Sequence, residues 1–174
     1  MTRVLFIDNG VEFDSLLLRE KPFGGAEVAF VSLVESLAKL GLKVSVYNNC
    51  INEGLINGVK WKRIGKELEY EDFDVLVVNR GDKYLNFRKE CKKRIFWIHN
   101  PAKYLLKYRY LSKLFVHKFK IIFSSIYHLK SYPWWAPAKA RIVIPYGIDD
   151  YLFQKKKTKN LNKDAIFTSN PMRG

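Results

Sequence analysis

Short runs of apolar residues recur along the chain, and polar or helix-like segments separate them. The runs are rich in β-branched and aromatic side chains, a composition that favours β-strands. They cover residues 3–8, 43–47, 59–64, 75–79, 94–99, 120–124 and 141–144. Residues 59–64 alternate between apolar and polar side chains, as an edge strand does, whereas the central runs are continuously apolar. Continuous runs predict strands that are covered on both faces of a sheet.

Residues 26–40 have the pattern of an amphipathic helix instead. Apolar side chains recur there at three- and four-residue spacing, at Ala26, Ala29, Phe30, Leu33, Leu37 and Leu40. Gly41 follows, and a glycine in the left-handed conformation commonly ends a helix. Strand, helix and strand in this order, with short links, predict right-handed crossovers between parallel strands. We therefore expect an α/β fold with a Rossmann-like, doubly wound parallel sheet.

The polar residues that follow the strands are candidate site residues, because ligands of doubly wound sheets bind outside the carboxyl ends of the strands. His99 ends one predicted strand and is followed by Asn100 and Pro101. A lone histidine is more often structural than functional, so both roles stay open for His99. The weaker candidates, chosen only by this position, are Asn9, Arg80, Asn100 and Ser125.

The stretch FGGAE, residues 23–27, places two adjacent glycines at the start of the predicted helix. Gly24 and Gly25 carry no side chain that would block a ligand, and a helix N-terminus offers free amide groups and about half a positive charge. This combination predicts an anion site, with a plain glycine turn as the alternative. The spacing is neither GxGxxG nor a Walker loop, and no acid ends the strand at residues 43–47, so a nicotinamide-dependent oxidoreductase is disfavoured.

The chain of 174 residues is long enough for one domain with a sizeable core, which we expect in residues 1–150. The composition changes after this domain, because residues 155–163 read KKKTKNLNK and contain few apolar side chains that could be buried. Residues 151–163 are therefore expected to be a basic linker. Residues 164–174 begin with a strand-like run and are expected to be the first strand of a truncated second domain.

The net charge of +14 favours a polyanionic partner such as nucleic acid, anionic lipid or a phosphorylated substrate, with an ordinary lysine-rich surface as the alternative. Residues 103–120, KYLLKYRYLSKLFVHKFK, are the densest basic and aromatic segment. A helix there either packs on the sheet or docks on an anionic membrane, with YPWW at residues 132–135 as an aromatic anchor. A basic nucleic-acid-binding α/β module is the alternative function, and the lack of a familiar binding motif disfavours it.

Other features exclude some classes of protein. No apolar run reaches the about 20 residues of a membrane-spanning helix, and no signal peptide precedes the first strand, so we expect a cytoplasmic protein. Cys50 and Cys91 have neither metal-binding nor redox spacing and are expected to be reduced. Asp72-Phe73-Asp74 has the form of a metal-binding DxD motif but precedes a strand, so it is expected to be a solvated turn.

The sequence from Gly24 to Tyr47, GGAEVAFVSLVESLAKLGLKVSVY, resembles the first helix and second strand of retaining glycosyltransferases with the GT-B fold. That family pairs two Rossmann-like domains across a cleft. Residues 144–149, IPYGID, are similar to the IPNGVD segment that closes its first domain, with Tyr146 in place of the usual Asn. Residues 167–174 resemble the start of its donor-binding domain. The resemblance thus covers most of the chain in order.

The resemblance implies that the chain is the N-terminal, acceptor-side half of a GT-B enzyme. Such an enzyme transfers a sugar from a nucleotide-diphosphate sugar to a glycan, a lipid-linked or another acceptor, with retention and with no metal or tightly bound cofactor. It implies donor-binding roles for Gly24, Gly25 and Arg173, and a catalytic position near the donor sugar for His99. A second basic residue of the family is missing where Ser169 and Asn170 stand. Residues 1–174 alone are expected to have negligible transfer activity, and peripheral contact with the inner membrane leaflet is expected.

Overall fold

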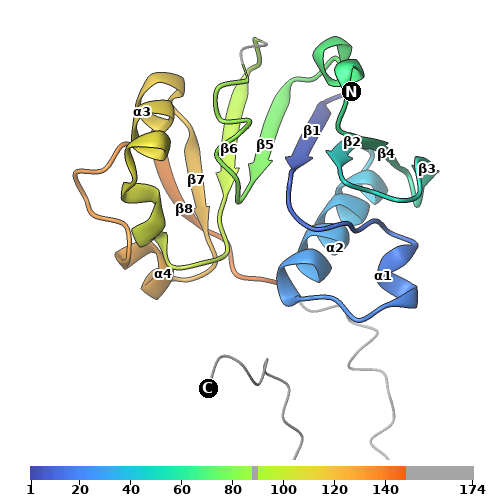
Figure 1. The fold of residues 1–174 in the computed structure, drawn as a ribbon, viewed down its shortest axis with the longest axis horizontal. Coiled ribbons are helices and arrows are strands. Elements are labelled where there is room, and N and C mark those ends of the chain that lie inside the picture. Colours follow the sequence, from blue (N-terminus) through green and yellow to red (C-terminus); the bar gives the residue numbers. More distant parts are fainter. Residues whose placement is uncertain (88–89, 148–174) are drawn as a thin grey trace, which may run out of the picture.

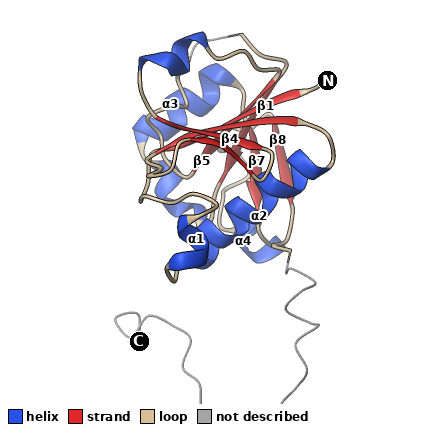
Figure 2. Ribbon diagram, turned by 90° about the vertical axis from the view of Figure 1, so that its right-hand side faces the viewer, coloured by secondary structure: helices blue, strands red, loops and turns tan. Residues whose placement is uncertain are grey.

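The structure is a computed structural model, and it describes residues 1–87 and 90–147 of the chain. It is an α/β fold with one sheet and helices on either side of it (Figures 1 and 2). The strands are β1 (Arg3–Asp8), β2 (Lys43–Asn48), β3 (Gly54–Ile56), β4 (Val59–Arg63), β5 (Val75–Asn79), β6 (Lys93–Trp97), β7 (Lys120–Phe123) and β8 (Ala140–Val143). The helices are α1 (Leu17–Glu20), α2 (Gly25–Lys39), α3 (Tyr108–His117) and α4 (Ile126–Lys130), with short 3₁₀ helices η1 (Lys66–Tyr70) and η2 (Ala102–Leu106).

The eight strands form one sheet in the order β3-β4-β2-β1-β5-β6-β7-β8. All neighbours are parallel except the β3–β4 pair. The chain winds outward from β1 in one direction to β2 and β4, and from β5 in the other direction to β8. The strand order therefore reverses between β1 and β5, which is the switch point of a doubly wound, Rossmann-like sheet. The predicted α/β parallel sheet is confirmed.

Two apolar clusters, one on each face of the sheet, form the core. Alternate side chains of β1 enter different clusters because successive residues of a strand point to opposite faces. Phe6 packs edge-to-face on Phe30 of α2, with ring centroids 5.4 Å apart. On the other face Leu5 belongs to the cluster that contains Tyr110 and Leu114 of α3.

Helix α2 begins and ends close to the predicted positions. Gly41 has φ of +85°, and the backbone N–H of Leu42 donates to the carbonyl of Leu37, so the expected left-handed end is confirmed. The predicted apolar stripe is wrong in part, since Leu40 is 77% exposed while Val31 and Val34 are in the core. The helix is rotated towards β2 and β4, which it covers.

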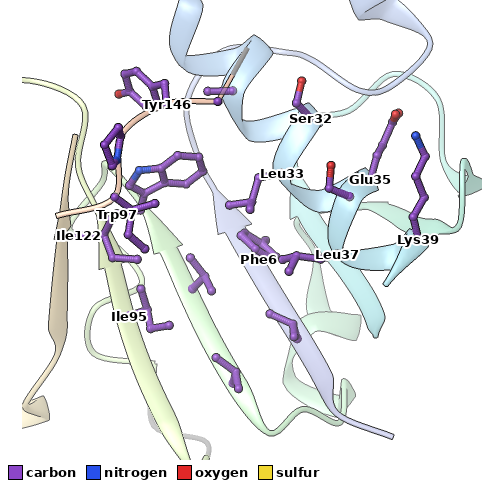
Figure 3. Close-up of a pocket in the computed structure, with 18 residues that line it drawn as sticks. Phe6, Ser32, Leu33, Glu35, Leu37, Lys39, Ile95, Trp97, Ile122 and Tyr146 are labelled. Carbon is purple, nitrogen blue, oxygen red and sulfur yellow. The ribbon is translucent and has the colours of Figure 1, made fainter. Parts of the chain in front are cut away.

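The face of β5, β6 and β7 on the α2 side carries no helix among the described residues, so the described part of the chain covers only one face of these strands with helices. When successive parallel strands are added in one direction along a sheet, right-handed crossovers place all their connections on the same face of the sheet. The connections from β5 to β8 therefore pack on the face opposite α2. An apolar groove of about 690 Å³ remains beside α2 (Figure 3). Side chains of the bare strand face, including Val77, Ile95 and Ile122, line it.

Residues 59–64 were expected to form an edge strand, and this is also wrong. The short strand β3 pairs antiparallel with β4 and lies outside it. The turn between them is Asn57-Gly58, with φ of +50° and +79°, as in the tight turns that join hairpin strands. The expected linker (151–163) and second-domain strand (164–174), with Arg173, lie outside the described residues.

Candidate functional site

Two buried polar residues end the two strands at the switch point. Asp8 is the last residue of β1 and Asn79 the last of β5, and the two are paired across the sheet. Asp8 is 1% exposed and Asn79 is fully buried. The side-chain amide of Asn79 donates to Oδ2 of Asp8, and the backbone N–H of Gly10 donates to Oδ1 at 2.6 Å. A buried carboxylate needs such donors, because an unpaired one costs several kcal/mol.

Arg80 connects this pair to helix α2. Its Nε and Nη2 donate to Oδ2 of Asp8 at 3.1 and 3.0 Å, and its Nη1 donates to Oε1 of Glu27 at 2.5 Å. The backbone of Arg80 has φ of +49°, a left-handed conformation that is unfavourable for a long side chain and that turns it back over β1. Since two carboxylates already occupy the guanidinium, Arg80 is not an open anion-binding group. Arg80 was expected to line a cleft, but it connects the carboxylates of Asp8 and Glu27 within the site.

His99 extends the same set of contacts to the far side of the site. Its Nε2 lies 2.7 Å from Oδ1 of Asn79, and its Nδ1 lies 2.6 Å from the hydroxyl of Tyr146. The carboxylate of Asp8 can only accept, so the Asn79 amide nitrogen faces Asp8 and its oxygen faces His99. Nε2 of His99 therefore carries the hydrogen, and Nδ1 accepts from Tyr146.

The imidazole of His99 is neutral at ordinary pH. Burial lowers the pKa of His99 to about 4, and the positive charge of Arg80 adds to the shift. The ring is enclosed by Tyr146, which stacks on it at 15°, and by Trp97, whose ring centroid is 4.7 Å away. Because both ring nitrogens have partners, His99 is not a free general base while Tyr146 is in place. The catalytic role stays a prediction.

These contacts define a switch-point network that runs from the start of α2 to the end of β8. Its members are Asp8, Glu27, Asn79, Arg80, His99 and Tyr146. Of the residues expected at the site, it includes Arg80 and His99. The sequence did not indicate Asp8 and Asn79, because each is the last residue of a strand and not one of the polar residues that follow it. Glu27 was visible in the FGGAE stretch and Tyr146 in the IPYGID segment.

The two glycines at the start of α2 have different surroundings. Gly24 is the N-cap residue and Gly25 the first helical residue, and both are exposed. A Cβ on Gly24 would lie 2.7 Å from Oε2 of Glu27, whereas a Cβ on Gly25 would meet nothing within 4 Å. A side chain at Gly24 would thus displace Oε2 of Glu27, while Gly25 faces open space beside the network. The predicted exposure of backbone to an approaching ligand holds at Gly25.

The remaining candidates lie at the same edge but outside the network. Asn9 is exposed after β1. Ser125 caps α4, its hydroxyl accepting from the backbone N–H of His128 at 3.0 Å. The carbonyl of Asn100 lies 2.6 Å from Nε2 of His128, which joins the ends of β6 and β7. Asn100 and Ser125 therefore have structural contacts here.

The expected position of the DxD sequence is confirmed at the amino end of β5, opposite the site. The side chain of Asp72 is 74% exposed and pairs with Arg3, whereas that of Asp74 is 15% exposed and pairs with Arg3 and Lys92. In residues 1–87 and 90–147, no group of three His, Cys, Asp or Glu side chains could hold a metal ion. Within the same residues, no helix combines the length and the apolar character needed to cross a membrane.

The apolar groove meets the network at one end. Figure 3 shows Tyr146 and Trp97 at that end, with Leu33 and Leu37 of α2 along one wall. Fold and site together define a Rossmann-like α/β domain with a polar network at its switch point, buried at Asp8, Glu27 and Asn79 and more exposed towards Tyr146. In comparisons with known proteins, no family model, no curated protein and no solved structure matches the chain.

Proposed function

We propose that the chain is the acceptor-side lobe of a retaining GT-B glycosyltransferase, which transfers a sugar from a nucleotide-diphosphate sugar to a glycan, a lipid-linked or another acceptor. The observation that carries the proposal is the continuous set of contacts from Glu27, beside the glycine turn, to His99. The resemblance expects the diphosphate at Gly25 and the sugar at His99. The network joins these two positions at one edge of the sheet.

The charges of the network suit the sugar side of the reaction. Asp8 and Glu27 carry two negative charges against the single positive charge of Arg80, and His99 is neutral. Positive charge develops on the sugar carbon as its bond to the leaving oxygen breaks. Fixed negative charge nearby lowers the energy of that state, and a protonated imidazole would raise it. The low pKa of His99 therefore supports a place beside the sugar.

The leaving diphosphate needs the opposite sign of potential. On this lobe the exposed amide groups at Gly25 and the positive end of α2 would supply part of it. A cation from a second lobe would supply the rest, and Arg173 is the candidate in the sequence, outside the described residues. By itself, the acceptor-side lobe should accordingly bind a donor weakly and transfer no sugar.

Binding of the donor is the appropriate test on this chain. Saturation-transfer NMR with a panel of UDP-, GDP- and ADP-sugars should find at least one that binds, with contacts to the sugar protons. Gly25→Val should remove this binding, because the new side chain would fill the open space at the helix start. The backbone of Gly25 is not left-handed, so the variant should remain folded.

Gly65→Val is the matched control. Like Gly25, Gly65 is an exposed glycine at the start of a helix, but it is the extended N-cap residue of η1 and lies outside the network. The proposal requires that this variant binds as the wild type does. A chain that binds none of the nucleotide sugars, or that loses binding equally in both variants, would contradict the proposal. Equal binding of plain nucleotide diphosphates, with no sugar contacts, would also contradict it.

A further inference from the structure

The positive charge of the chain is concentrated in one part of the fold. Residues 91–147 contain twelve Lys and Arg and no Asp or Glu, whereas residues 1–90 contain thirteen basic and fourteen acidic residues. Residues 91–147 form β6, η2, α3, β7, α4 and β8, which lie together at one end of the sheet (Figure 1). We call this part the cationic end. Its composition differs from that of an evenly lysine-rich surface.

The cationic end also exposes large aromatic side chains. Tyr108 and Phe115 of α3 are 85% and 73% exposed, and Tyr127 of α4 is 82% exposed. Trp134 and Trp135, in the loop between α4 and β8, are 87% and 58% exposed. Tryptophan is normally well buried, and grouped exposed apolar side chains commonly mark an interaction surface. Helix α3, within the segment 103–120, thus packs on the sheet through Tyr110 and Leu114 and leaves Tyr108 and Phe115 exposed.

The loop that carries the two tryptophans has a fixed shape. Nη2 of Arg141 donates to the backbone carbonyls of Pro133, Trp134 and Ala136, each at 2.8 Å. One guanidinium thus gathers three carbonyl groups of the loop, which restrains its backbone. The exposure of Trp134 and Trp135 is a property of this restrained loop. The three hydrogen bonds hold the backbone of the loop, and on this backbone both indoles are exposed.

We propose that the cationic end docks on the surface of an anionic lipid bilayer. Trp134, Trp135 and Tyr127 would enter the interfacial region, where tryptophan and tyrosine are favoured because their rings have an apolar body and a polar tip. The lysines around them would lie at the level of the anionic headgroups. Electrostatic attraction between the basic side chains of residues 91–147 and the anionic lipids would then add to the binding free energy gained by inserting the rings.

The residue types favour lipid over nucleic acid as the partner. Lys130 and Lys139 are exposed near the aromatic side chains, whereas Arg109 pairs with a carboxylate and Arg141 holds the loop. Nucleic-acid recognition relies mainly on the fork of arginine, while the point charge of lysine is sufficient for a charged membrane. Ile126, 65% exposed beside Tyr127, suits the boundary of the acyl chains and offers nothing to a base or phosphate.

Docking in this orientation would bring the site close to the bilayer. Helix α4 begins at the carboxyl end of β7, at the edge of the sheet where α2 also begins (Figure 1). If the proposed sugar transfer holds, on which this consequence alone depends, the acceptor class would be lipid-linked. The docking itself follows from charge and exposure and stands independently of the reaction.

Vesicle flotation with the whole chain tests the docking. The protein should bind vesicles of phosphatidylcholine with phosphatidylglycerol at low salt, and bind phosphatidylcholine alone far more weakly. Trp134→Ser with Trp135→Ser should weaken binding roughly tenfold or more, because two interfacial rings are lost. Lys130→Gln should weaken it about fivefold, the effect of one charge near an anionic surface. Trp61 and Trp97 are 0% and 6% exposed, so a blue shift of emission on binding reports the other two tryptophans.

Tyr70→Ser and Lys66→Gln are the matched controls. Both residues are exposed on η1, outside the cationic end, and both variants should bind as the wild type does. Because Trp134 and Trp135 are highly exposed, their replacement should leave the fold intact, and a circular-dichroism melt checks this for each variant. Absence of binding to anionic vesicles at low salt would overturn the proposal. Binding without an emission shift, equal losses in the controls, or tighter tryptophan-dependent binding of single-stranded RNA would each overturn it too.

Discussion

The hydroxyl of Tyr146 lies 2.6 Å from Nδ1 of His99, and the two rings stack with centroids 5.8 Å apart. This contact closes the switch-point network on the side away from α2. It also determines the hydrogen-bonding state of the imidazole, since a hydroxyl that donates to Nδ1 stabilises only the neutral ring. Tyr146 is thus a positioning residue for His99. The IPNGVD segment of the glycosyltransferases, which residues 144–149 resemble, has Asn at this position.

Tyr146→Phe should raise the pKa of His99 from about 4 towards its ordinary value near 6.5. The substitution keeps the stacked ring but removes the donor that favours the neutral imidazole. The pKa can be measured from the pH dependence of the His99 ring resonances in NMR spectra. Tyr127→Phe, on the exposed face of α4, is the control and should leave the pKa of His99 unchanged. An unchanged or lower pKa in Tyr146→Phe would show that the hydroxyl does not donate to His99.

The stability of the fold should decrease as the pH falls from about 6.5 to about 4. In this window the unfolded chain protonates His99, with a pKa near 6.5, while the folded chain keeps it neutral, with a pKa of about 4. The unfolded state then binds more protons, so the free energy of unfolding is lost on acidification, by up to about 3 kcal/mol. Urea denaturation at several pH values measures it, with His99→Gln as the reference. If both proteins lose stability in parallel across the window, His99 is not the group responsible.

Arg80→Met should destabilise the fold by about 3–5 kcal/mol at neutral pH. The change leaves the carboxylates of Asp8 and Glu27 without their shared cation while both remain buried. Adding Glu27→Gln to this variant should recover part of the loss, because it removes one of the two uncompensated charges. Denaturant unfolding measures the three stabilities, and Lys83→Met, at an exposed neighbouring position, serves as the control. A double variant less stable than Arg80→Met would argue against the bridging role of Arg80.

The two adjacent glycines should respond differently to the same substitution. Gly24→Ala places a methyl group against Oε2 of Glu27 and should cost about 1–2 kcal/mol through the displaced Glu27–Arg80 pair. Gly25→Ala meets open space in the first helical position and should leave stability unchanged or raise it by up to about 1 kcal/mol. Thermal unfolding of each variant separates the two outcomes. Equal destabilisation would mean that the turn, rather than Glu27, requires glycine at both positions.

Local sequence patterns predicted most of the elements. The seven predicted strands agree with observed strands to within two residues at each end, and the helix at 26–40 is displaced by one residue. The pattern is less informative about orientation, as α2 shows. Leu33 fits the apolar stripe but is 37% exposed at the groove, because no described helix covers the strands in front of it. The apolar pattern did not predict β3. The sequence does contain Asn57-Gly58, a dipeptide typical of hairpin turns, which joins β3 to β4.

The switch-point network depends on contacts that no local pattern contains. Asp8 and Asn79 are 71 positions apart and meet only because β5 pairs with β1. A polar residue at the end of a strand has the same local sequence whether it faces solvent or a buried partner. The role of Arg80 likewise follows from the two carboxylates brought to it by β1 and α2.

The amino-acid order was therefore sufficient for the succession of the strands and helix α2 and for the parallel arrangement of the sheet. These properties follow from hydrophobic periodicity and crossover handedness, which act within short stretches of chain. Tertiary structure alone decided which strands are neighbours, which polar side chains are buried together and which face of the sheet the described helices leave uncovered. Those outcomes arise from packing between segments that are distant in the sequence. The same packing keeps His99 neutral and leaves space for a side chain at Gly25 but not at Gly24.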